Sequence, residues 1–447
     1  MGGFSAFESI SLVLVVMFLS YMVSIMVPFL RRKPTRPGNP DDYGWHAFIP
    51  CRDEAAVIEG TLTRLRRDFP QCHVWVVDDD SDDETADIVL RCAASDPMVH
   101  LVQRRRPEAR TGKGDALNAA YVELNRFLPA DVDRSRIIVF VLDADGVMAP
   151  NALVQVAGPE CFGDPEVGAA QIAVWMDNRD DPNPRPGDGR LVNFGASYLV
   201  RMQDLEFRTT IAAMQHLRER TGSVGLGGNG QFTRLSVLDE IAEKFHSPWH
   251  GSLLEDYELG LHVLLSGHRN RYVHETYVAQ EGLPRLRRLL TQRTRWAQGN
   301  MQCVRYVPQV VRSKYFSNSG VIEACYYLVL PYLQFVGVLV WPVALSLLAA
   351  DVVNTNGSFA DQWWFFLMLF LFGIAPFAMW GPIYRKQCCP EAPWWKGVLW
   401  GFGFWLYVYY TYAVTTRAVV RLIRGRAGWA KTRRNAEIAV GPTAKEA

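Results

Sequence analysis

The sequence places two aspartates, Asp143 and Asp145, directly after the apolar run Val139–Leu142. Such a run is typical of a buried strand. Side chains two positions apart on an extended backbone point the same way, so both carboxylates are expected to meet one hard cation, Mg²⁺ or Mn²⁺. A divalent ion there neutralises charge that develops on a diphosphate leaving group. A solvated turn is the alternative, and the apolar residues before the aspartates disfavour it.

A second acidic run, Asp78–Asp80, follows the apolar residues Val76 and Val77. Ser81 and Glu84 fit a capping box, so Asp82 and Asp83 are interpreted as charges at the start of a helix. Asp79 is then a carboxylate that packing does not need, and we expect it to bind the base or ribose of a nucleotide.

Two further clusters follow predicted strand ends. Glu54 comes just after the run Phe48–Pro50, where helix capping by Asp53 with a first-turn glutamate is the simpler interpretation. Lys113 lies between two glycines at the start of a helical pattern, where backbone N–H groups and a cation suit a phosphate. The spacing is not that of a P-loop, so this cluster is weak evidence by itself.

Later in the chain, Glu255 and Asp256 begin another helical pattern. Stabilisation of the helix dipole would explain them. The functional interpretation makes Asp256 a general base that accepts a proton from a hydroxyl group. The segment Gln292–Trp296 carries Arg295 and Trp296, which suit a phosphate and a stacked sugar ring. A helix lying on a membrane surface is the alternative for this segment.

The elements that must position these residues form an α/β pattern from Trp45 to about Val278, with a largely parallel sheet. Ligands of such sheets lie beyond the carboxyl ends of the strands, where the acidic clusters fall. The expected strands are Trp45–Pro50, His73–Val77, Val99–Gln103, Arg136–Leu142 and Gly168–Met176, and the expected helices include Glu54–Arg67, Glu84–Ala94 and Asp115–Phe127.

An apolar run, Ser9–Leu30, precedes this domain and is long enough to span a bilayer. The basic run Arg31–Lys33 follows it, so the positive-inside rule places the next domain in the cytoplasm. A cleaved signal peptide would need a basic start and a small-residue cleavage site, and the sequence shows neither.

Three more apolar stretches, Ala324–Ala350, Trp363–Tyr384 and Trp394–Val420, follow the domain. Three spans would leave the carboxyl tail outside. Seven basic residues predict a tail inside: Arg417, Arg421, Arg424, Arg426, Lys431, Arg433 and Arg434. One of the stretches is therefore expected to lie in the interface or to enter and return.

The 447 residues carry a net charge of +1, which argues against nucleic-acid binding as the main role. Eight cysteines show no disulfide or metal-ligand spacing, as expected of reduced thiols.

Together, and in their order along the chain, these clusters resemble those of the membrane-embedded family 2 glycosyltransferases with a GT-A fold. That group includes cellulose, chitin and hyaluronan synthases, plant mannan synthase-like enzymes and ceramide glucosyltransferases. The resemblance runs from about Trp45 to Asn300. It implies an α/β GT-A (Rossmann-like) cytoplasmic domain flanked by transmembrane helices, in a multi-pass protein whose expected location is the plasma membrane.

The resemblance also implies roles for single residues. Asp79 matches the acid that contacts the uridine of a UDP-sugar, with Glu54 and Lys113 nearby. Asp143 and Asp145 match the D-x-D pair for nucleotide and metal, and Asp256 matches the catalytic base. The Q-x-x-R-W motif implies diphosphate contact by Gln292 and Arg295, and acceptor contact by Trp296.

The chain departs from the family pattern in two places. Asp80 stands where the usual D-D-G-S has glycine. The acceptor loop reads Gly227–Gln231 without the Cys or Ser of many synthases, which leaves Asn229 as the predicted acceptor contact and points to a different acceptor. Gln171 fits a family position near the donor only loosely.

The resulting prediction is an inverting, processive β-glycosyltransferase that extends a polysaccharide from a UDP-sugar at the membrane. The alternative keeps the chemistry but adds one sugar to a lipid acceptor. A transport or scaffold protein that only binds nucleotide is disfavoured by the acids at strand ends. The expected domains are an anchor (1–33), a GT-A domain (40–282), interfacial helices (283–322), a membrane region (323–423) and a basic tail (424–447).

Overall fold

The fold of the chain is known from a computed structural model, which describes residues 6–354 and 363–425. Most of the predicted basic tail, including Arg426, Lys431, Arg433 and Arg434, lies outside the described residues. The centre of the molecule is an eight-stranded sheet of order β3-β2-β1-β4-β7-β6-β8-β5. Its strands are β1 (Gly44–Cys51), β2 (His73–Asp79), β3 (Val99–Arg104), β4 (Ile137–Val141), β5 (Val147–Met148), β6 (Val167–Met176), β7 (Gln231–Arg234) and β8 (Arg269–Gln280).

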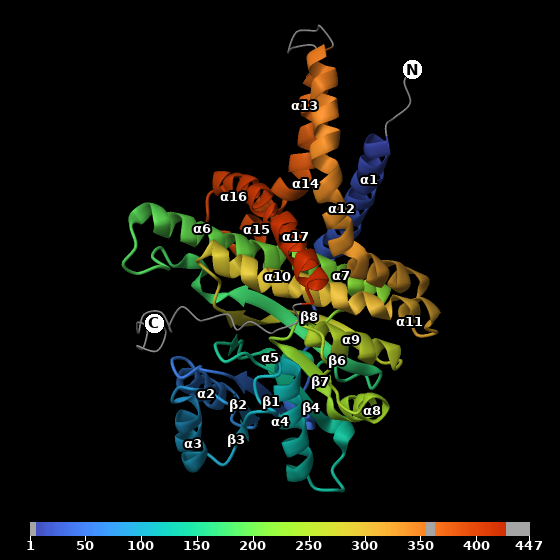
Figure 1. Cartoon of the computed structure of the whole chain (residues 1–447). Helices are drawn as coiled ribbons and strands as arrows, with labels where there is room; N and C mark the ends of the chain where they lie inside the picture. The colour runs from blue at the N-terminus through green and yellow to red at the C-terminus, as the bar shows by residue number, and fades with distance from the viewer. Residues whose placement is uncertain (1–5, 355–362, 426–447) are drawn as a thin grey trace.

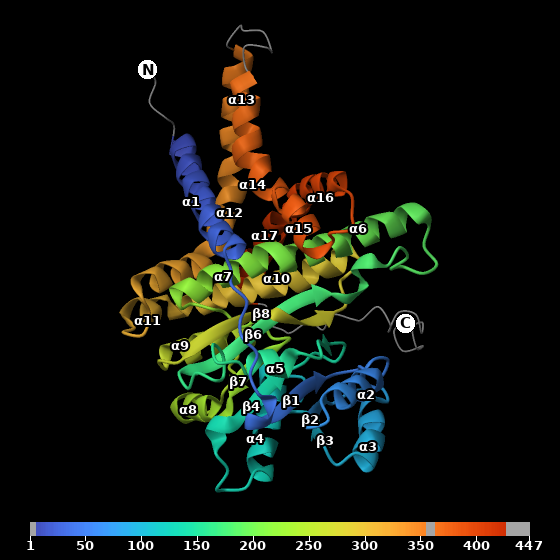
Figure 2. The same cartoon turned by 180° about the vertical axis from the view of Figure 1, so that it is seen from behind.

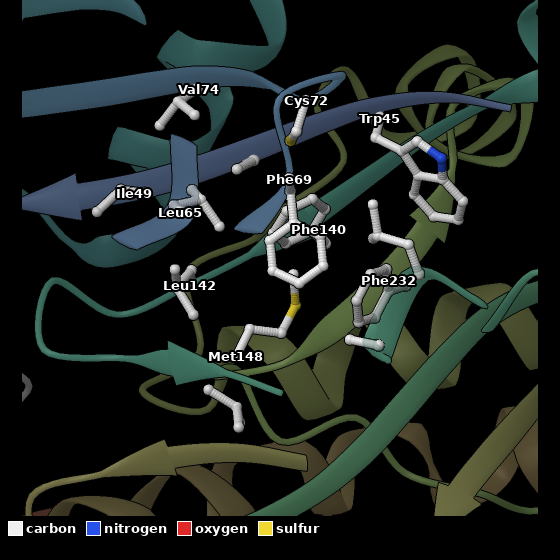
Figure 3. Packing of buried hydrophobic residues seen from close by; sticks show 14 of the residues in the cluster. Trp45, Ile49, Leu65, Phe69, Cys72, Val74, Phe140, Leu142, Met148 and Phe232 are labelled. Atoms are coloured by element: carbon white, nitrogen blue, oxygen red, sulfur yellow. The ribbon is translucent and has the colours of Figure 1, made fainter. Parts of the chain in front are cut away.

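The first four strands pair in parallel, as their continuous apolar runs predict for strands covered on both faces. The short strand β7 is antiparallel to both of its neighbours, β4 and β6. Helices on both faces of the sheet cover two separate cores. In one of them the rings of Phe140 and Phe232 stack at 5.0 Å beside Trp45 (Figure 3).

The helices of this domain are α2 (Ile58–Asp68), α3 (Thr85–Ser95), α4 (Lys113–Phe127), α5 (Ala152–Val156), α8 (Leu235–Phe245) and α9 (Glu255–Leu265). The five predicted strands are all present, with ends shifted by at most a few residues. The first predicted helix starts later than Glu54, because Asp53 takes a left-handed conformation (φ 54°) and the chain turns before Ile58. Strands β5, β7 and β8 were not foreseen.

A layer of long helices lies between the sheet domain and the projecting helices α1, α12 and α13 (Figures 1 and 2). Helix α6 (Arg190–Glu206) continues through a π-helical turn, Phe207–Ile211, into α7 (Ala212–Thr221). Helix α10 (Leu286–Cys303), followed by α11 (Val307–Arg312), runs beside them. Buried apolar residues of this layer form a third core with α1 and the carboxyl-terminal helices.

Three segments in the described part of the chain are long and apolar enough to cross a membrane: Ser9–Leu30, Asn318–Leu347 and Phe366–Cys388. They belong to α1 (Ala6–Leu30), to α12 (Asn318–Asn354) and to the continuous helical run of α13 (Trp363–Met368), α14 (Ala375–Ala378) and α15 (Trp380–Cys388). Figures 1 and 2 show α1, α12 and α13 projecting from the same side of the molecule.

The predicted fourth apolar stretch, Trp394–Val420, is not a single helix. It divides into α16 (Trp394–Tyr407) and α17 (Tyr410–Ile423), each of 14 residues, and α17 packs against α10. Fourteen helical residues rise about 21 Å, less than the roughly 30 Å of a hydrocarbon core. Neither helix by itself therefore reaches across a hydrocarbon core.

Candidate active site

A single cavity of about 460 Å³ collects all the predicted site residues except Asp145. It opens along the carboxyl ends of β1, β2 and β4, where the parallel register brings Cys51 opposite Asp78 and Phe48 opposite Val141. The predicted residues on its wall are Glu54, Asp79, Lys113, Asp143, Asn229, Asp256, Gln292, Arg295 and Trp296.

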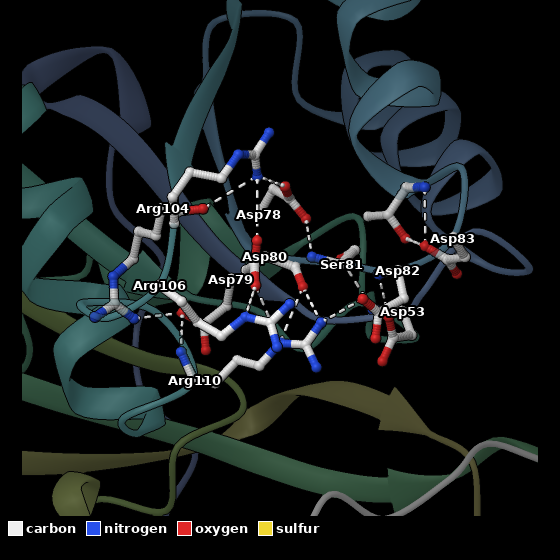
Figure 4. A network of polar contacts seen from close by, with 12 residues as sticks. Asp53, Asp78, Asp79, Asp80, Ser81, Asp82, Asp83, Arg104, Arg106 and Arg110 are labelled. Atoms are coloured by element: carbon white, nitrogen blue, oxygen red, sulfur yellow. Dashed lines mark hydrogen bonds and ion pairs between the residues drawn. The ribbon is translucent and has the colours of Figure 1, made fainter.

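Asp79, at the end of β2, is almost fully buried and is held by two groups from the β3 side (Figure 4). Nη1 of Arg104 lies 2.5 Å from its Oδ1, and the backbone N–H of Arg110 donates to the same oxygen at 3.0 Å. Both contacts use Oδ1, which leaves Oδ2 to accept from a ligand. This arrangement fixes the carboxylate before any nucleotide binds.

Asp80 replaces the glycine of the family pattern yet keeps a left-handed conformation, with φ of 60°. That conformation costs an L-residue about 1 kcal/mol. Ion pairs of its carboxylate with Arg106 at 2.7 Å and Arg110 at 3.4 Å offset the cost. The tight turn is therefore retained without glycine.

The predicted capping box at Ser81 and Glu84 is wrong. Helix α3 begins after Glu84 without a side-chain cap from that residue. The Ser81 hydroxyl instead accepts from the backbone N–H of Asp53 at 2.9 Å, and Asp83 accepts from the N–H of Thr85 at 3.0 Å. Ser81 thus ties the β1 loop to the β2 loop, a contact that local sequence patterns do not specify.

Lys113 opens α4, as predicted, and its Nζ lies 2.8 Å from Oδ1 of Asp143. Burial alone would lower the pKa of Lys113, but the carboxylates of Asp143, Glu255 and Asp256 more than offset this, and the net direction is upward. The ammonium therefore stays charged between the aspartate of the β4 loop and the acids of α9.

Asn229 is buried, and its amide is engaged on both sides. Its Oδ1 accepts from the backbone N–H of Asp143 at 3.1 Å, and its Nδ2 donates to Gln280 at 3.1 Å. In this structure Asn229 braces the loop that carries Asp143. Its predicted contact with an acceptor remains a prediction.

Asp145 lies in a turn, not on the extended backbone that the sequence suggested. The N–H of Gly146 donates to the carbonyl of Asp143 at 2.7 Å, which closes the turn, and Asp145 Oδ2 accepts from the N–H of Glu281 at 3.3 Å. Two carboxylates on a loop held by backbone hydrogen bonds supply the oxygen donors that hard divalent cations use. The donor set therefore fits Mg²⁺ or Mn²⁺.

Asp256 lies in the first turn of α9, and Oδ1 accepts from the N–H of Tyr257 at 2.6 Å. The glycine loop crosses its other oxygen: a Cβ at Gly228 would lie 2.7 Å from Oδ2. Burial, followed by the neighbouring carboxylate of Glu255, raises the pKa of Asp256 to about 7. A carboxylate with that pKa matches the requirement for a general base near neutral pH.

Glu258, two residues after Asp256 in α9, has a different environment. It is fully buried, accepts from the hydroxyl of Tyr306 at 2.6 Å and from the N–H of Ser252 at 3.0 Å, and forms an ion pair with Arg305. Those contacts lower its pKa despite the opposing effect of burial. Glu258 therefore anchors α9 to the 3-10 turn Val304–Tyr306 that follows α10.

Helix α10 presents Gln292, Arg295 and Trp296 to the cavity. Between them Arg293 is buried, and its Nη2 lies 2.6 Å from Oε2 of Glu206. The Arg293 guanidinium also lies 4.5 Å from the centre of the Trp296 ring. Arg293 was not among the site residues predicted from the sequence, yet it fixes the ring of Trp296, which was.

Glu206 also joins helices α16 and α17 to this network. It accepts from the hydroxyl of Tyr407 at 2.9 Å and of Tyr410 at 2.6 Å. It stands at the end of α6, immediately before the π-helical turn, and turns of that kind are frequent at functional sites. No sequence pattern signalled Glu206, because its partners lie 87 to 204 residues away.

The cavity wall also includes residues of α12 and α17, among them Leu330, Pro331, Gln334, Val414 and Thr415. One continuous space therefore joins the strand ends of the sheet domain to α12, a candidate membrane span, and to α17.

Comparison with known proteins agrees with this architecture. Residues 44–299 match the family model described as glycosyltransferase like family 2. The chain is 27% identical over 260 residues to the β-monoglucosyldiacylglycerol synthase of Trichormus variabilis, covering 57% of this chain and 48% of that protein. It is 24% identical over 298 residues to the probable glycosyltransferase YdaM of Bacillus subtilis, covering 65% and 63%. The chain thus spans about half the length of the first of these relatives.

Among solved structures, the chain resembles the mannosyltransferase PcManGT of Pyrobaculum calidifontis, solved with GDP-Man and Mn²⁺. The TM-score is 0.59 at 18% identity, over 94% of this chain and 99% of that one. At this identity the likeness concerns the fold, and it confirms the predicted GT-A-like α/β domain. The family model covers more than half of the 447 residues. The chain belongs to the family 2 glycosyltransferases.

Proposed function

We propose that this protein transfers a sugar from a nucleoside diphosphate sugar to the hydroxyl group of a membrane lipid, with inversion at the anomeric carbon. The observation that carries the proposal is the continuity of the cavity. Its wall includes Asp79, Asp143 and Asp256 as well as side chains of α12 and α17, of which Leu330, Pro331 and Val414 are apolar. A hydrophilic donor and a lipid acceptor can therefore meet at one carboxylate.

The donor end is assigned by its charges. Oδ2 of Asp79 accepts from the base or ribose, while Lys113, Gln292 and Arg295 face the diphosphate. UDP is the nucleotide that the motif set implies. Asp143 and Asp145 would hold Mg²⁺ or Mn²⁺, which when bound supplies positive charge beside the diphosphate.

The chemical step is a single displacement at the anomeric carbon, with Asp256 as the general base. Its carboxylate takes the proton of the acceptor hydroxyl as that oxygen forms a bond to the anomeric carbon. The bond from that carbon to the diphosphate breaks, and the nucleoside diphosphate leaves with the electron pair. A pKa of about 7 leaves a substantial fraction of Asp256 ionised at neutral pH. Trp296, held by Arg293, supplies an apolar ring face against the acceptor or the transferred sugar.

The same site would also serve a processive polysaccharide synthase, which the motif resemblance suggested first. Two observations favour the lipid acceptor. The relative aligned over 260 residues is named as a monoglucosyldiacylglycerol synthase. The end of the cavity away from the donor is lined by apolar residues such as Leu330 and Val414.

Membrane placement follows from the helices. We propose that α1, α12 and the α13–α15 run span the membrane, while α16 and α17 lie at its cytoplasmic surface. Two spans after the sheet domain return the chain to the cytoplasm, where Arg417, Arg421 and Arg424 meet anionic headgroups. The conflict between span number and tail charge is thereby removed. The plasma membrane remains our expectation for its location.

The experiment that tests the function is product analysis with purified protein in detergent. A panel of radiolabelled nucleotide sugars is offered with diacylglycerol and other hydroxyl lipids. We expect one donor to give a chloroform-soluble product that carries a single sugar. A labelled product that stays in the aqueous phase and elutes as a polymer would reject the lipid acceptor in favour of polysaccharide synthesis.

A further inference from the structure

The membrane end of the cavity contains polar atoms that the proposed displacement does not use. Nη2 of Arg218 and Oδ1 of Asn300 are buried and make no hydrogen bond within the described residues. Both side chains line the cavity, and both are more than nine-tenths buried. One atom is a donor and the other an acceptor, and a hydroxyl group can pair with either kind of atom.

Both residues contact Tyr327, Arg218 at its ring and Asn300 at its backbone carbonyl. The Arg218 guanidinium lies 4.0 Å from the centre of the Tyr327 ring, and the Tyr257 ring lies 5.0 Å from it. Asn300 Nδ2 donates to the carbonyl of Tyr327 at 3.3 Å. Pro331, four residues later, cannot donate to that carbonyl, so the proline break in α12 creates the acceptor that Asn300 satisfies. Tyr257 follows the proposed base directly, which places this cluster beside Asp256.

The charges of this region are already balanced. Nε of Arg218 donates to Glu323 at 2.7 Å, and both side chains are buried. Arg293 is paired with Glu206 in the same way. A phosphate would bring a further charge of about −1.5 to −2 into a space whose two arginines already have carboxylate partners. An uncharged headgroup meets no such cost.

Next to this cluster the wall becomes apolar. Leu330, Pro331 and Val414 line the cavity, and Thr415 Oγ1 donates to Gln334 Oε1 at 3.2 Å, which joins α17 to α12. Because α12 is a candidate membrane span, this end of the cavity lies where hydrocarbon chains are available.

We propose that the membrane end of the cavity binds an uncharged, hydroxyl-bearing acceptor lipid, with Arg218 and Asn300 contacting its headgroup and its chain lying between α12 and α17 at Leu330 and Val414. This inference rests on the proposed function and specifies its acceptor. It requires no partner protein and no change at the donor end.

The test uses the full-length protein in detergent micelles, with dioleoylglycerol as the hydroxyl lipid and the donor that the sugar panel identifies. Leu330→Trp fills the chain space from a half-buried position. Leu339→Trp is the matched control, since that residue of the same helix is 59% exposed. Asn300→Leu removes the headgroup contact.

We expect Leu330→Trp and Asn300→Leu to lower kcat/KM for the lipid by about tenfold or more, the effect of about 1.4 kcal/mol. Donor affinity, measured by calorimetry, is expected to stay within about twofold, a change of less than 0.5 kcal/mol. Leu339→Trp is expected to match the unsubstituted protein. Equal acceptor kinetics for both tryptophan variants would overturn the inference.

A second measurement does not depend on how the variants fold. A diacylglycerol that carries a diazirine on its chain is photolysed with the unsubstituted protein, and labelled peptides are identified. Labelling of the peptides around Leu330 and Val414, displaced by excess dioleoylglycerol, supports the site. Labelling that excess lipid does not displace, or that falls only on α1 and α13, contradicts it.

Transfer to dioleoylglycerol and transfer to a polyprenyl phosphate are also compared, which separates this inference from the function on which it rests. Preference for a polyprenyl phosphate over dioleoylglycerol would overturn the uncharged headgroup while leaving lipid glycosylation intact. Formation of polymer alone would reject the proposed function itself.

Discussion

Gly228 lies with its backbone against the carboxylate of Asp256, and a Cβ at this glycine would stand 2.7 Å from Oδ2. The glycine also has a φ of 76°, which an L side chain rarely adopts. The loop therefore packs directly against the proposed base, and a side chain at position 228 would displace one of the two.

Gly228→Ala is predicted to abolish most transfer activity, because the added methyl group displaces Asp256 and strains the loop by about 1 kcal/mol. Gly227→Ala is the matched control. A Cβ there meets no atom closer than Gln171 at 3.6 Å. Initial rates of labelled sugar transfer check both variants, and equal rates for the two would contradict this fit.

The pH dependence is predicted to follow Asp256. Its pKa is raised to about 7, first by burial and then by Glu255, so activity rises with pH through neutrality as the base ionises. Removing the negative charge in Glu255→Gln lowers the pKa of Asp256 and moves the acidic limb of the profile to lower pH. Glu243→Gln, an exposed acid on α8, is the control and leaves the limb unmoved. A limb that stays in place in Glu255→Gln would assign the titration to another group.

The ion pair of Arg293 with Glu206 is predicted to stabilise the layer of α6, α10 and α17. The side chains are only 7% and 14% exposed, so Glu206→Gln leaves a buried cation without its charged partner. Breaking a buried pair in this way costs about 3 kcal/mol, which lowers the thermal midpoint in detergent by several degrees. Glu123→Gln breaks the exposed pair with Arg126 and is expected to leave the midpoint unchanged. Equal midpoints for the two variants would show that the pair of Arg293 with Glu206 does not stabilise this layer.

Chelation is predicted to stop transfer, since the diphosphate would leave without a compensating cation. EDTA treatment followed by titration with Mn²⁺ or Mg²⁺ checks this. Asp145→Asn is expected to require more metal for half-maximal activity, while Asp115→Asn, an exposed acid of α4, is not. Full activity in EDTA, or an unchanged metal requirement in Asp145→Asn, would show that these carboxylates hold no metal.

The sequence predicted the features that depend on neighbouring residues. Strand β4 and the aspartates after it, the start of α4 at Lys113 and the start of α9 at Glu255 all follow from apolar runs and turn-forming residues. Nine of the ten selected side chains reach one cavity. Glu54, Asp79, Lys113 and Asp143 do so because parallel strands end at the same edge of the sheet, whereas Asp256 and the residues of α10 are brought there by helix packing.

The features that were missed depend on register and on distant contacts. Arg104 reaches Asp79 because β3 pairs with β2 in the register that sets these residues opposite each other. Strand β7 has only four residues, too few for a periodic pattern, yet it separates the two parallel parts of the sheet. The pairing of Arg293 with Glu206 needs two helices to cross, which no local run of residues specifies.

The most direct test of the central claim is the turnover of Asp256→Asn with saturating donor and lipid acceptor. The amide keeps the size of the side chain but cannot take the acceptor proton. We predict that kcat falls by about 10²- to 10⁴-fold while the nucleotide sugar still binds in calorimetry. Turnover close to that of the unsubstituted protein would contradict the assignment of Asp256 as the base.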